Sequence, residues 1–361
     1  MTDTITVESW THSLPPFPTT LSLTRTSLPS LGPNDLLLEI YSASLNPVDV
    51  QLSNLSIFRI PSLGSNPKGL GKDFVGKLLA KGSNVKRDDL QIGDVLFGVT
   101  MNPLGGPLSG TLSTISILDL SRTLVIKKPP SLSYSQAASL PLSFLTAKTC
   151  LSLPYFQLPS TSSSSRGSDT PGTIVVLGGT TSTGINLIQY AKLKLDEIID
   201  YTKEESIVDR LKQIKDTLGE GGFVSIIDCI GGVNELLSTG IWKSLLLPRR
   251  GSYITIVGDK TDRQRLGGFF TNFWNLNQVW RSLKTWDWLG FRGGGPRYYC
   301  IDFDMTRKEW LEEVEEMVDE RVGMKVIVDQ EFEFEKVGEA FERLLQGKST
   351  GKIVVKVKSS E

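Results

Sequence analysis

The sequence predicts an α/β protein with a mostly β part and a part in which strands and helices alternate. Short apolar runs, separated by Gly, Pro, Asn and Asp turns, fill residues 1 to about 128. From Thr173 onward, apolar β-branched runs alternate with apolar residues at helical spacing. The chain has 361 residues, which is enough for two domains with separate cores.

The mostly β part contains three predicted strands, over residues 36–40, 74–79 and 94–97, each bounded by turn residues. Residues 133–150 are richer in Ala and Leu, which favours a helix. The serine-rich segment 160–170 has no hydrophobic or charge pattern that would order it, so we expect a polar loop there.

A strand, a glycine turn and an amphipathic helix follow one another from residue 173. The β-branched run 173–178 ends in Gly178-Gly-Thr-Thr-Ser-Thr-Gly184, and apolar residues then recur at helical spacing as far as Leu195. Glycines let the backbone approach a pyrophosphate, and a helix N-terminus supplies N–H donors and a positive dipole. The turn therefore predicts a dinucleotide site, with contacts from Gly178, Gly179, Thr181, Ser182, Thr183 and Gly184.

The remaining elements continue the alternation of strands and helices to the end of the chain. Strands are expected at residues 197–201, 224–229, 251–257 and 351–357, and helices at 207–218, 310–318 and 337–344.

The composition disfavours several classes of function. The formal net charge of −1 gives no bulk attraction to nucleic acid, so we expect no such partner. The only histidine, His12, is expected at the surface, which disfavours triad and two-histidine metal chemistry. The three cysteines, Cys150, Cys229 and Cys300, have no CxxC spacing and predict neither disulfides nor zinc. The N-terminus carries acidic residues and no apolar segment typical of a targeting signal, and no apolar run in the sequence approaches the roughly 20 residues of a membrane span. We therefore expect a soluble cytoplasmic protein.

Aromatic side chains alternate with arginines and lysines over residues 268–299. We interpret this region as a hydrophobic wall over a substrate cleft or as a dimer contact. An interfacial membrane patch is a second interpretation. Stacking on nucleic acid is a third, and the net charge gives it little support.

Seven short motifs stand in a fixed order along nearly the whole chain. Beside the glycine turn they are Asn46-Pro-Val-Asp49, Gly71-Lys-Asp-Phe-Val-Gly76, Gly93-Asp-Val-Leu-Phe-Gly98, Ala137-Ala-Ser-Leu-Pro141 with Thr146-Ala147, Ile227-Asp-Cys-Ile-Gly-Gly232 and Gly351-Lys-Ile-Val-Val355. Each motif alone is weak evidence, because Gly-Asp and Gly-Gly turns are usually only turns. Together they resemble the zinc-independent branch of the medium-chain dehydrogenase/reductase superfamily, the quinone oxidoreductase and enoyl reductase group.

This resemblance implies a GroES-like β-barrel domain over residues 1–130 and 300–361, and a Rossmann domain over 131–299. It implies hydride transfer from NADPH, with NADH not excluded, to a quinone or an α,β-unsaturated carbonyl, and it implies a homodimer. The substrate would be a small apolar molecule. Zinc-binding relatives place a cysteine ligand about where Asn46 stands, so zinc is not expected.

By resemblance, two residues carry the chemistry: Asn46 near the nicotinamide and substrate, and Thr146 near the nicotinamide amide. Alternatively, Asn46 stabilises the turn before Pro47, and Thr146 bonds the preceding helical turn. Asp49 and Asp73 are expected to cap local backbone. Further cofactor contacts are predicted at Tyr201, Lys203, Cys229, Gly231, Val257 and Lys352.

One strand–helix unit of the family is missing where Leu195 leads directly to Asp196, about 20 residues at typical element lengths. The lost strand normally carries the residue that contacts the adenosine ribose. The strand expected at 197–201 either slides into the vacant position, bringing Lys203 near the ribose, or pairs poorly and destabilises the domain.

Three interpretations of this loss remain open. The chain is an incomplete gene model or splice form of an ordinary reductase, or an enzyme with weakened cofactor selectivity. Otherwise it is a catalytically dead interaction protein, associated with a membrane or a partner through residues 268–299.

Overall fold

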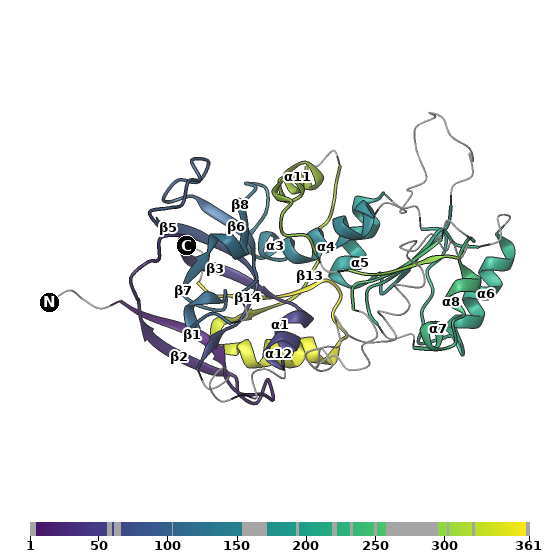
Figure 1. The fold of residues 1–361 in the computed structure, drawn as a ribbon, viewed down its shortest axis with the longest axis horizontal. Coiled ribbons are helices and arrows are strands. Elements are labelled where there is room, and N and C mark those ends of the chain that lie inside the picture. Colours follow the sequence, from purple (N-terminus) through teal and green to yellow (C-terminus); the bar gives the residue numbers. More distant parts are fainter. Residues whose placement is uncertain are drawn as a thin grey trace, which may run out of the picture. The chain divides into compact units, whose positions relative to one another are not determined.

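The computed structural model describes residues 5–55, 60, 66–102, 104–153, 172–192, 195–218, 222–231, 234–248, 251–257, 295–301, 303–319 and 322–358. These residues form two compact units (Figure 1). Unit 1 holds the described residues from 5 to 145 and from 304 to 358. Unit 2 holds those from 146 to 257 and from 295 to 303. The predicted loop 160–170 and most of the aromatic region 268–299 lie outside the described residues.

Unit 1 is built on two sheets. A seven-stranded sheet has the order β13-β14-β3-β5-β6-β8, and β7 pairs with β3; a three-stranded sheet has the order β2-β1-β4. Only β13 and β14 pair in parallel among these strands. The strands are β1 Thr6–His12, β2 Ser22–Ser27, β3 Asp35–Leu45, β4 Lys68–Gly69, β5 Asp73–Lys81, β6 Val95–Thr100, β7 Ile115–Asp119, β8 Thr123–Lys127, β13 Val328–Glu333 and β14 Lys352–Lys356. The strands predicted in this part of the chain are therefore confirmed.

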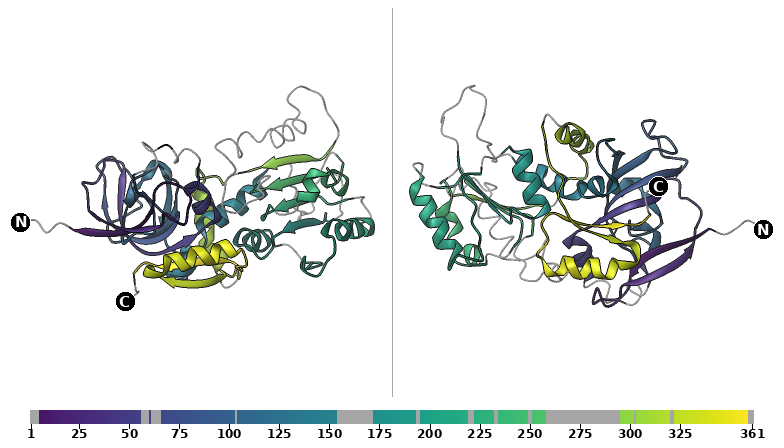
Figure 2. Two further views of the ribbon diagram at one scale, coloured as in Figure 1. Left: turned by 90° about the horizontal axis from the view of Figure 1, so that it is seen from below. Right: turned by 180° about the vertical axis from the view of Figure 1, so that it is seen from behind.

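The core of unit 1 forms between the seven-stranded sheet and a C-terminal helix. Along β3, alternate residues Leu36, Leu38 and Ile40 are fully buried, which is the period expected of a strand with one face on a core. Helix α12 (Val337–Gln346) buries Phe341, whose ring packs edge-on against Phe17 with centroids 4.8 Å apart. Figure 2 shows this helix beside β13 and β14. Burying each such side chain contributes roughly 1.5–3 kcal/mol.

The single helix predicted over 133–150 is two helices, α3 (Tyr134–Ala138) and α4 (Pro141–Ser152). Ser133 and Gln136 form a capping box that starts α3. Proline lacks an N–H and disfavours helical backbone in the residue before it, so Pro141 separates the two helices and starts the second.

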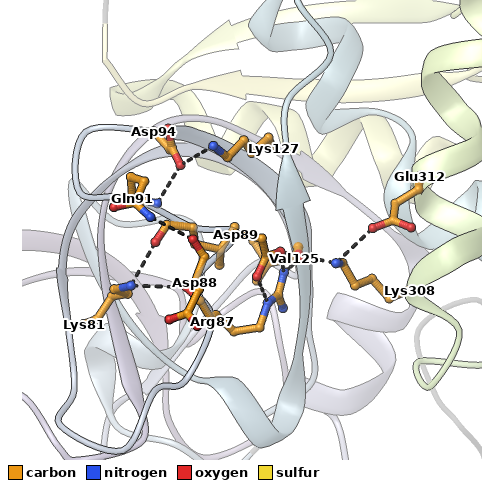
Figure 3. A network of polar contacts seen from close by, with 11 residues as sticks. Lys81, Arg87, Asp88, Asp89, Gln91, Asp94, Val125, Lys127, Lys308 and Glu312 are labelled. Carbon is orange, nitrogen blue, oxygen red and sulfur yellow. Dashed lines mark hydrogen bonds and ion pairs between the residues drawn. The ribbon is translucent and has the colours of Figure 1, made fainter.

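A network of exposed charges joins the loop between β5 and β6 to helix α11 (Lys308–Val318), both in unit 1 (Figure 3). The Arg87 guanidinium donates two hydrogen bonds of 2.7 Å to the Asp89 carboxylate. Lys308 Nζ lies 3.2 Å from the same carboxylate and 2.9 Å from Glu312. These surface ion pairs attach α11 to the loop between β5 and β6 of the seven-stranded sheet.

Unit 2 contains a four-stranded parallel sheet of order β12-β11-β10-β9 in the described residues. Its elements are β9 Ile174–Leu177, α5 Ser182–Tyr190, α6 Ile207–Thr217, β10 Ser225–Asp228, α7 Asn234–Ser238, α8 Trp242–Leu245, β11 Ser252–Thr255 and β12 Arg297–Cys300. Successive strand residues face opposite sides. Ile226, Tyr253 and Tyr298 pack with α6, α7 and α8, and Ile227 and Ile254 pack with α4 and α5. Both faces are covered, as in doubly wound α/β domains.

The strand predicted over residues 197–201 does not form. The segment therefore neither slides into the vacant strand position nor pairs weakly with a neighbouring strand. Ile198 and Tyr201 are 81% and 69% exposed. Asp200 accepts hydrogen bonds from the backbone N–H and hydroxyl of Thr202, and Glu197 pairs with Arg210. Local side-chain bonds thus replace a sheet ladder. Between β9 and β10 the described residues hold two helices and no strand, and β9 pairs with β10 alone.

Candidate functional site

The predicted glycine turn lies in unit 2, where β9 ends and α5 begins. Gly178 has φ +82°, a left-handed conformation that favours glycine. At Gly184, a Cβ atom would lie 2.3 Å from the carbonyl oxygen of Gly178, so only glycine lets α5 pack this closely. These are two of the glycine roles expected of a dinucleotide-binding turn.

Thr181 is the N-cap of α5 and fixes the geometry of the turn. Its Oγ1 accepts the Gly184 N–H at 3.1 Å and donates to the Gly178 carbonyl at 2.8 Å. Ser182 and Thr183 form the first turn of the nine-residue helix. The N-terminus of this helix combines backbone N–H donors with the positive end of the helix dipole, which favours an anion.

Three further predicted residues meet this turn at the carboxyl edge of the sheet. Leu177 and Asp228 are register partners, and the Cys229 N–H donates to the Leu177 carbonyl at 3.0 Å. The Cys229 thiol hydrogen-bonds to Thr181, and burial raises its pKa well above 9.0. Val257 follows β11 at the same edge, and Gly231 follows β10. The structure therefore gathers the glycine turn, Cys229, Gly231 and Val257.

Asp228, which was not among the predicted site residues, shapes the loop after β10. Its Oδ1 accepts the N–H groups of Ile230 and Gly231 at 3.0 and 2.8 Å. Its Oδ2 accepts the Tyr253 hydroxyl at 3.1 Å. Burial raises the pKa of this carboxyl. The apolar residues before Asp228 indicate only a buried strand, so the sequence did not predict that this carboxylate binds the backbone of the following loop.

Two predicted cofactor residues stand apart in solvent. Tyr201 is 69% exposed. The Lys203 side chain is 80% exposed and its Nζ lies 3.0 Å from Asp200. The turn that holds both residues replaces the expected strand, so sliding of a strand does not bring Lys203 to a ribose position.

Thr146, predicted to be catalytic, is 5% exposed on α4. Two residues further along α4, Lys148 reaches α5: its Nζ lies 2.5 Å from the Tyr190 hydroxyl and 4.2 Å from the ring centroid. This cation–π contact holds the helix of the glycine turn against α4.

In unit 1, Asn46 lies in a buried polar cluster. Asn46 Nδ2 donates to Asp73 Oδ2 at 2.9 Å, and Lys352 Nζ donates to Asn46 Oδ1 at 2.5 Å and to Asp73 Oδ2 at 2.7 Å. Ser44 Oγ donates to the same carboxylate oxygen, and the Leu142 N–H donates to Asp73 Oδ1 at 2.8 Å. Asn46 and Lys352, predicted from separate motifs, thus share one partner.

Asp49 and Lys72 lie beside this cluster and are not fully paired. Asp49 Oδ2 accepts the Asn46 N–H at 2.7 Å, but its buried Oδ1 has no hydrogen-bond partner among the residues that the structure describes. Burial raises the pKa of Asp49 to about 6. Lys72 is 5% exposed, and burial lowers its pKa. No pattern in the sequence points to Lys72, because a lysine between a turn and a strand usually faces solvent.

His12 was expected at the surface, and that expectation is wrong. The residue is 4% exposed at the end of β1, and burial lowers its pKa to about 4. Its ring packs edge-on against Phe17 at 6.2 Å. Lys68 and Lys72 both act on its charge, so three basic side chains gather in the interior of unit 1.

No group of three or more His, Cys, Asp or Glu that could hold a metal ion was found in the part of the chain that the structure describes. None of the described helices is both long and apolar enough to cross a membrane.

Comparison with known proteins agrees with this architecture. A family model described as "zinc-binding dehydrogenase" matches residues 193–355. Protein YIM1 of Vanderwaltozyma polyspora is 29% identical, covering 90% of this chain and 91% of its own. The human "NAD(P)H oxidoreductase RTN4IP1, mitochondrial" is 27% identical, covering 90% of this chain and 82% of its own. A quinone oxidoreductase from Coxiella burnetii superposes with a TM-score of 0.72 at 22% identity, covering 98% and 100% of the two chains.

The fold is therefore a GroES-like domain combined with a Rossmann-like domain. The family model, the relatives and the shared fold support the resemblance to the medium-chain dehydrogenase/reductase superfamily.

Proposed function

We propose that this protein is an NAD(P)H-dependent oxidoreductase that reduces a quinone or an α,β-unsaturated carbonyl without a metal. The main support is the turn from Gly178 to Gly184, where the absence of a side chain at Gly184 lets the N-terminus of α5 pack closely against the end of β9. The names of its relatives support the general activity, since one is an NAD(P)H oxidoreductase and another a quinone oxidoreductase.

The residues present fit one half of such a cofactor. The backbone around Gly178 and the first turn of α5 suit a pyrophosphate, because they combine N–H donors with the positive end of a helix. The adenosine half has weaker support, since Tyr201 and Lys203 lie in an exposed turn. We propose NADPH as the cofactor, with little discrimination against NADH.

At the reacting end we assign the orienting role to Asn46 and, by family resemblance, to Thr146. When bound, the reduced nicotinamide supplies the hydride. Asn46 is held by Asp73 and Lys352, so its amide has one orientation. An amide where zinc-binding relatives have a cysteine supports metal-free chemistry. A cytoplasmic location, a small apolar substrate and a homodimer complete the proposal.

A charge placed at the helix start tests the cofactor site apart from the fold. In Ser182→Asp, a carboxylate at the first position of α5 favours the helix dipole but repels a pyrophosphate. We expect an unchanged or higher melting temperature and at least a tenfold loss of NADPH affinity, about 1.4 kcal/mol, by tryptophan fluorescence. Ser206→Asp, at the N-cap of α6, is the matched control and should bind as the wild type does.

Folded wild-type protein that binds neither NADPH nor NADH would overturn the proposal. That result would favour the second candidate, a reductase fold that serves only as an interaction protein. The exposure of Tyr201 and the absence of a strand between β9 and β10 in the described residues are the observations that favour it.

A further inference from the structure

The buried amino group of Lys72 has no hydrogen-bond or ion-pair partner among the described residues. Lys72 stands between β4 and β5, directly before Asp73, and is 5% exposed. In the described part of the chain, neither a hydrogen-bond acceptor nor an ion-pair carboxylate contacts its Nζ. Lys352, in the same cluster, is in contrast committed to three oxygens.

Neither of the two neighbouring acids, Asp49 and Asp73, forms an ion pair with Lys72 in the described structure. Asp73 accepts hydrogen bonds from Leu142 at Oδ1 and from Ser44, Asn46 and Lys352 at Oδ2, and it forms no ion pair with Lys72 in the described structure. Asp49 attracts Lys72 electrostatically, yet its free oxygen stays beyond ion-pair distance. One cation and one carboxylate oxygen are therefore left over at the edge of the Asn46 cluster.

Leaving a charge buried and unpaired is unfavourable for folding, because the ammonium loses its hydration without gaining acceptors. Such arrangements concentrate where a charge is needed for binding or reaction. An ammonium in a water-poor site stabilises a negative oxygen far more strongly than one in bulk water. The position beside Asn46 is where the proposed function places the substrate.

We propose that Lys72 is a catalytic residue that binds the carbonyl oxygen of the substrate and donates a proton to it. The inference rests on the proposed function. Hydride adds to a ring or alkene carbon, and the electron pair of the broken π bond moves to the carbonyl oxygen. A proton passes from the Lys72 ammonium to that oxygen, and the neutral amine regains a proton from water. An enone thus becomes an enol, and a quinone becomes a keto tautomer that turns into the hydroquinone when water takes a proton from the reduced ring carbon and another proton is added to the second carbonyl oxygen.

The charged groups around Lys72 influence the pKa of its amino group. Asp49 and Asp73 favour the ammonium, whereas burial favours the amine. His12 and Lys68 add to the basic side of the cluster. Since burial is the larger influence on Lys72, the ammonium holds its proton less tightly than an exposed lysine does.

The test compares Lys72→Met and Lys72→Arg with Lys127→Met, an exposed lysine on β8 in the same unit. With a quinone substrate we expect Lys72→Met to lose about 100-fold or more in kcat. Its KM for NADPH should change by less than about threefold. Its melting temperature should rise by about 2 °C or more, because an unpaired buried charge is removed. Lys72→Arg should keep part of the activity.

A binding measurement separates this inference from the proposed function. 4-Nitrophenol is an oxygen-anion analogue whose phenolate absorbs visible light. Binding to the wild-type protein should lower the pKa of 4-nitrophenol, and binding to the Lys72→Met variant should leave that pKa unchanged. A wild-type protein that leaves this pKa unchanged, or a Lys72→Met variant within threefold of wild type in kcat, overturns the role of Lys72. A failure to bind NADPH or NADH overturns the proposed function instead.

Discussion

Lys352 Nζ lies 2.7 Å from the Asp73 carboxylate, joining two strands that are 279 residues apart in the chain. Lys352 is 4% and Asp73 0% exposed, so water does not screen the pair. The pair connects the first residues of β14 and β5 through β3, which lies between them in the sheet.

Removing one member of this pair should destabilise unit 1 strongly. In Lys352→Met the Asp73 carboxylate stays buried without its cation, for which about 3–5 kcal/mol is typical. We expect a loss of that size in the free energy of unfolding, measured by urea denaturation. Lys358→Met, which breaks the exposed pair with Glu39 near the same strand, should cost less than about 1 kcal/mol.

The buried carboxyl of Asp49 should make stability fall between pH 4 and 6. Its pKa is raised from 3.8 to about 6, so the folded state holds its proton more tightly than the unfolded state. Stability from this group is present below pH 4 and is lost as the pH rises through about 6. Asp49→Asn should gain stability relative to wild type at pH 7. Equal pH slopes for the two proteins would contradict the assignment.

His12 should act in the opposite direction over the same range. Its pKa is lowered from 6.5 to about 4, so the unfolded state binds the proton first as the pH falls. Stability from this group is present above about pH 6.5 and is lost as the pH falls toward 4. His12→Gln should therefore remove this loss, so that the stability of the variant rises as the pH falls from about 6 to 4. In wild type the two groups largely cancel, and each single variant should reveal the slope of the other.

The ion pairs that attach α11 should contribute little and should be sensitive to salt. Lys308→Ala removes contacts with Asp89 and Glu312, all at least one-third exposed (Figure 3). We expect less than about 1 kcal/mol of lost stability, and less still in high salt. Amide hydrogen exchange in α11 should accelerate in low salt only. An equal effect at both salt concentrations would indicate a packing role.

Adding one methyl group at Gly184 should disturb the glycine turn. The Cβ of Gly184→Ala would lie 2.3 Å from the Gly178 carbonyl oxygen, so α5 must shift. Strain of this kind typically costs about 1–3 kcal/mol. Thermal unfolding should show the loss. Gly106→Ala, where a Cβ meets nothing within 4 Å, is the control and should match the wild type closely.

Elements whose signals are local in the chain could be predicted from the sequence. The strand, the glycine turn and α5 follow from β-branched residues, a glycine with positive φ and an N-cap threonine, all of which are local in the chain. The order of the family motifs was sufficient for the two kinds of domain. The gathering of Cys229, Gly231 and Val257 at one edge follows from parallel pairing.

Other features depend on contacts that no local pattern contains. Residues 197–201 have the composition of a strand, but hydrogen bonds of Asp200 to Thr202 hold a turn instead. His12 lies among polar neighbours in the chain, yet pairing of β1 and packing on Phe17 bury it. Lys72 is buried because β5 begins at the next residue and Asp73 enters the cluster.

The bonds of Asn46 also determine which partners its side chain can accept. A carboxylate only accepts and an ammonium only donates, so the amide nitrogen must face Asp73 and the amide oxygen must face Lys352. A reversed amide would place two acceptors together and two donors together. The oxygen is engaged by an ammonium, while the nitrogen keeps a second hydrogen that no described residue takes up. Asn46 therefore offers an arriving molecule a donor rather than an acceptor, which makes the site selective for ligands that bring a lone pair.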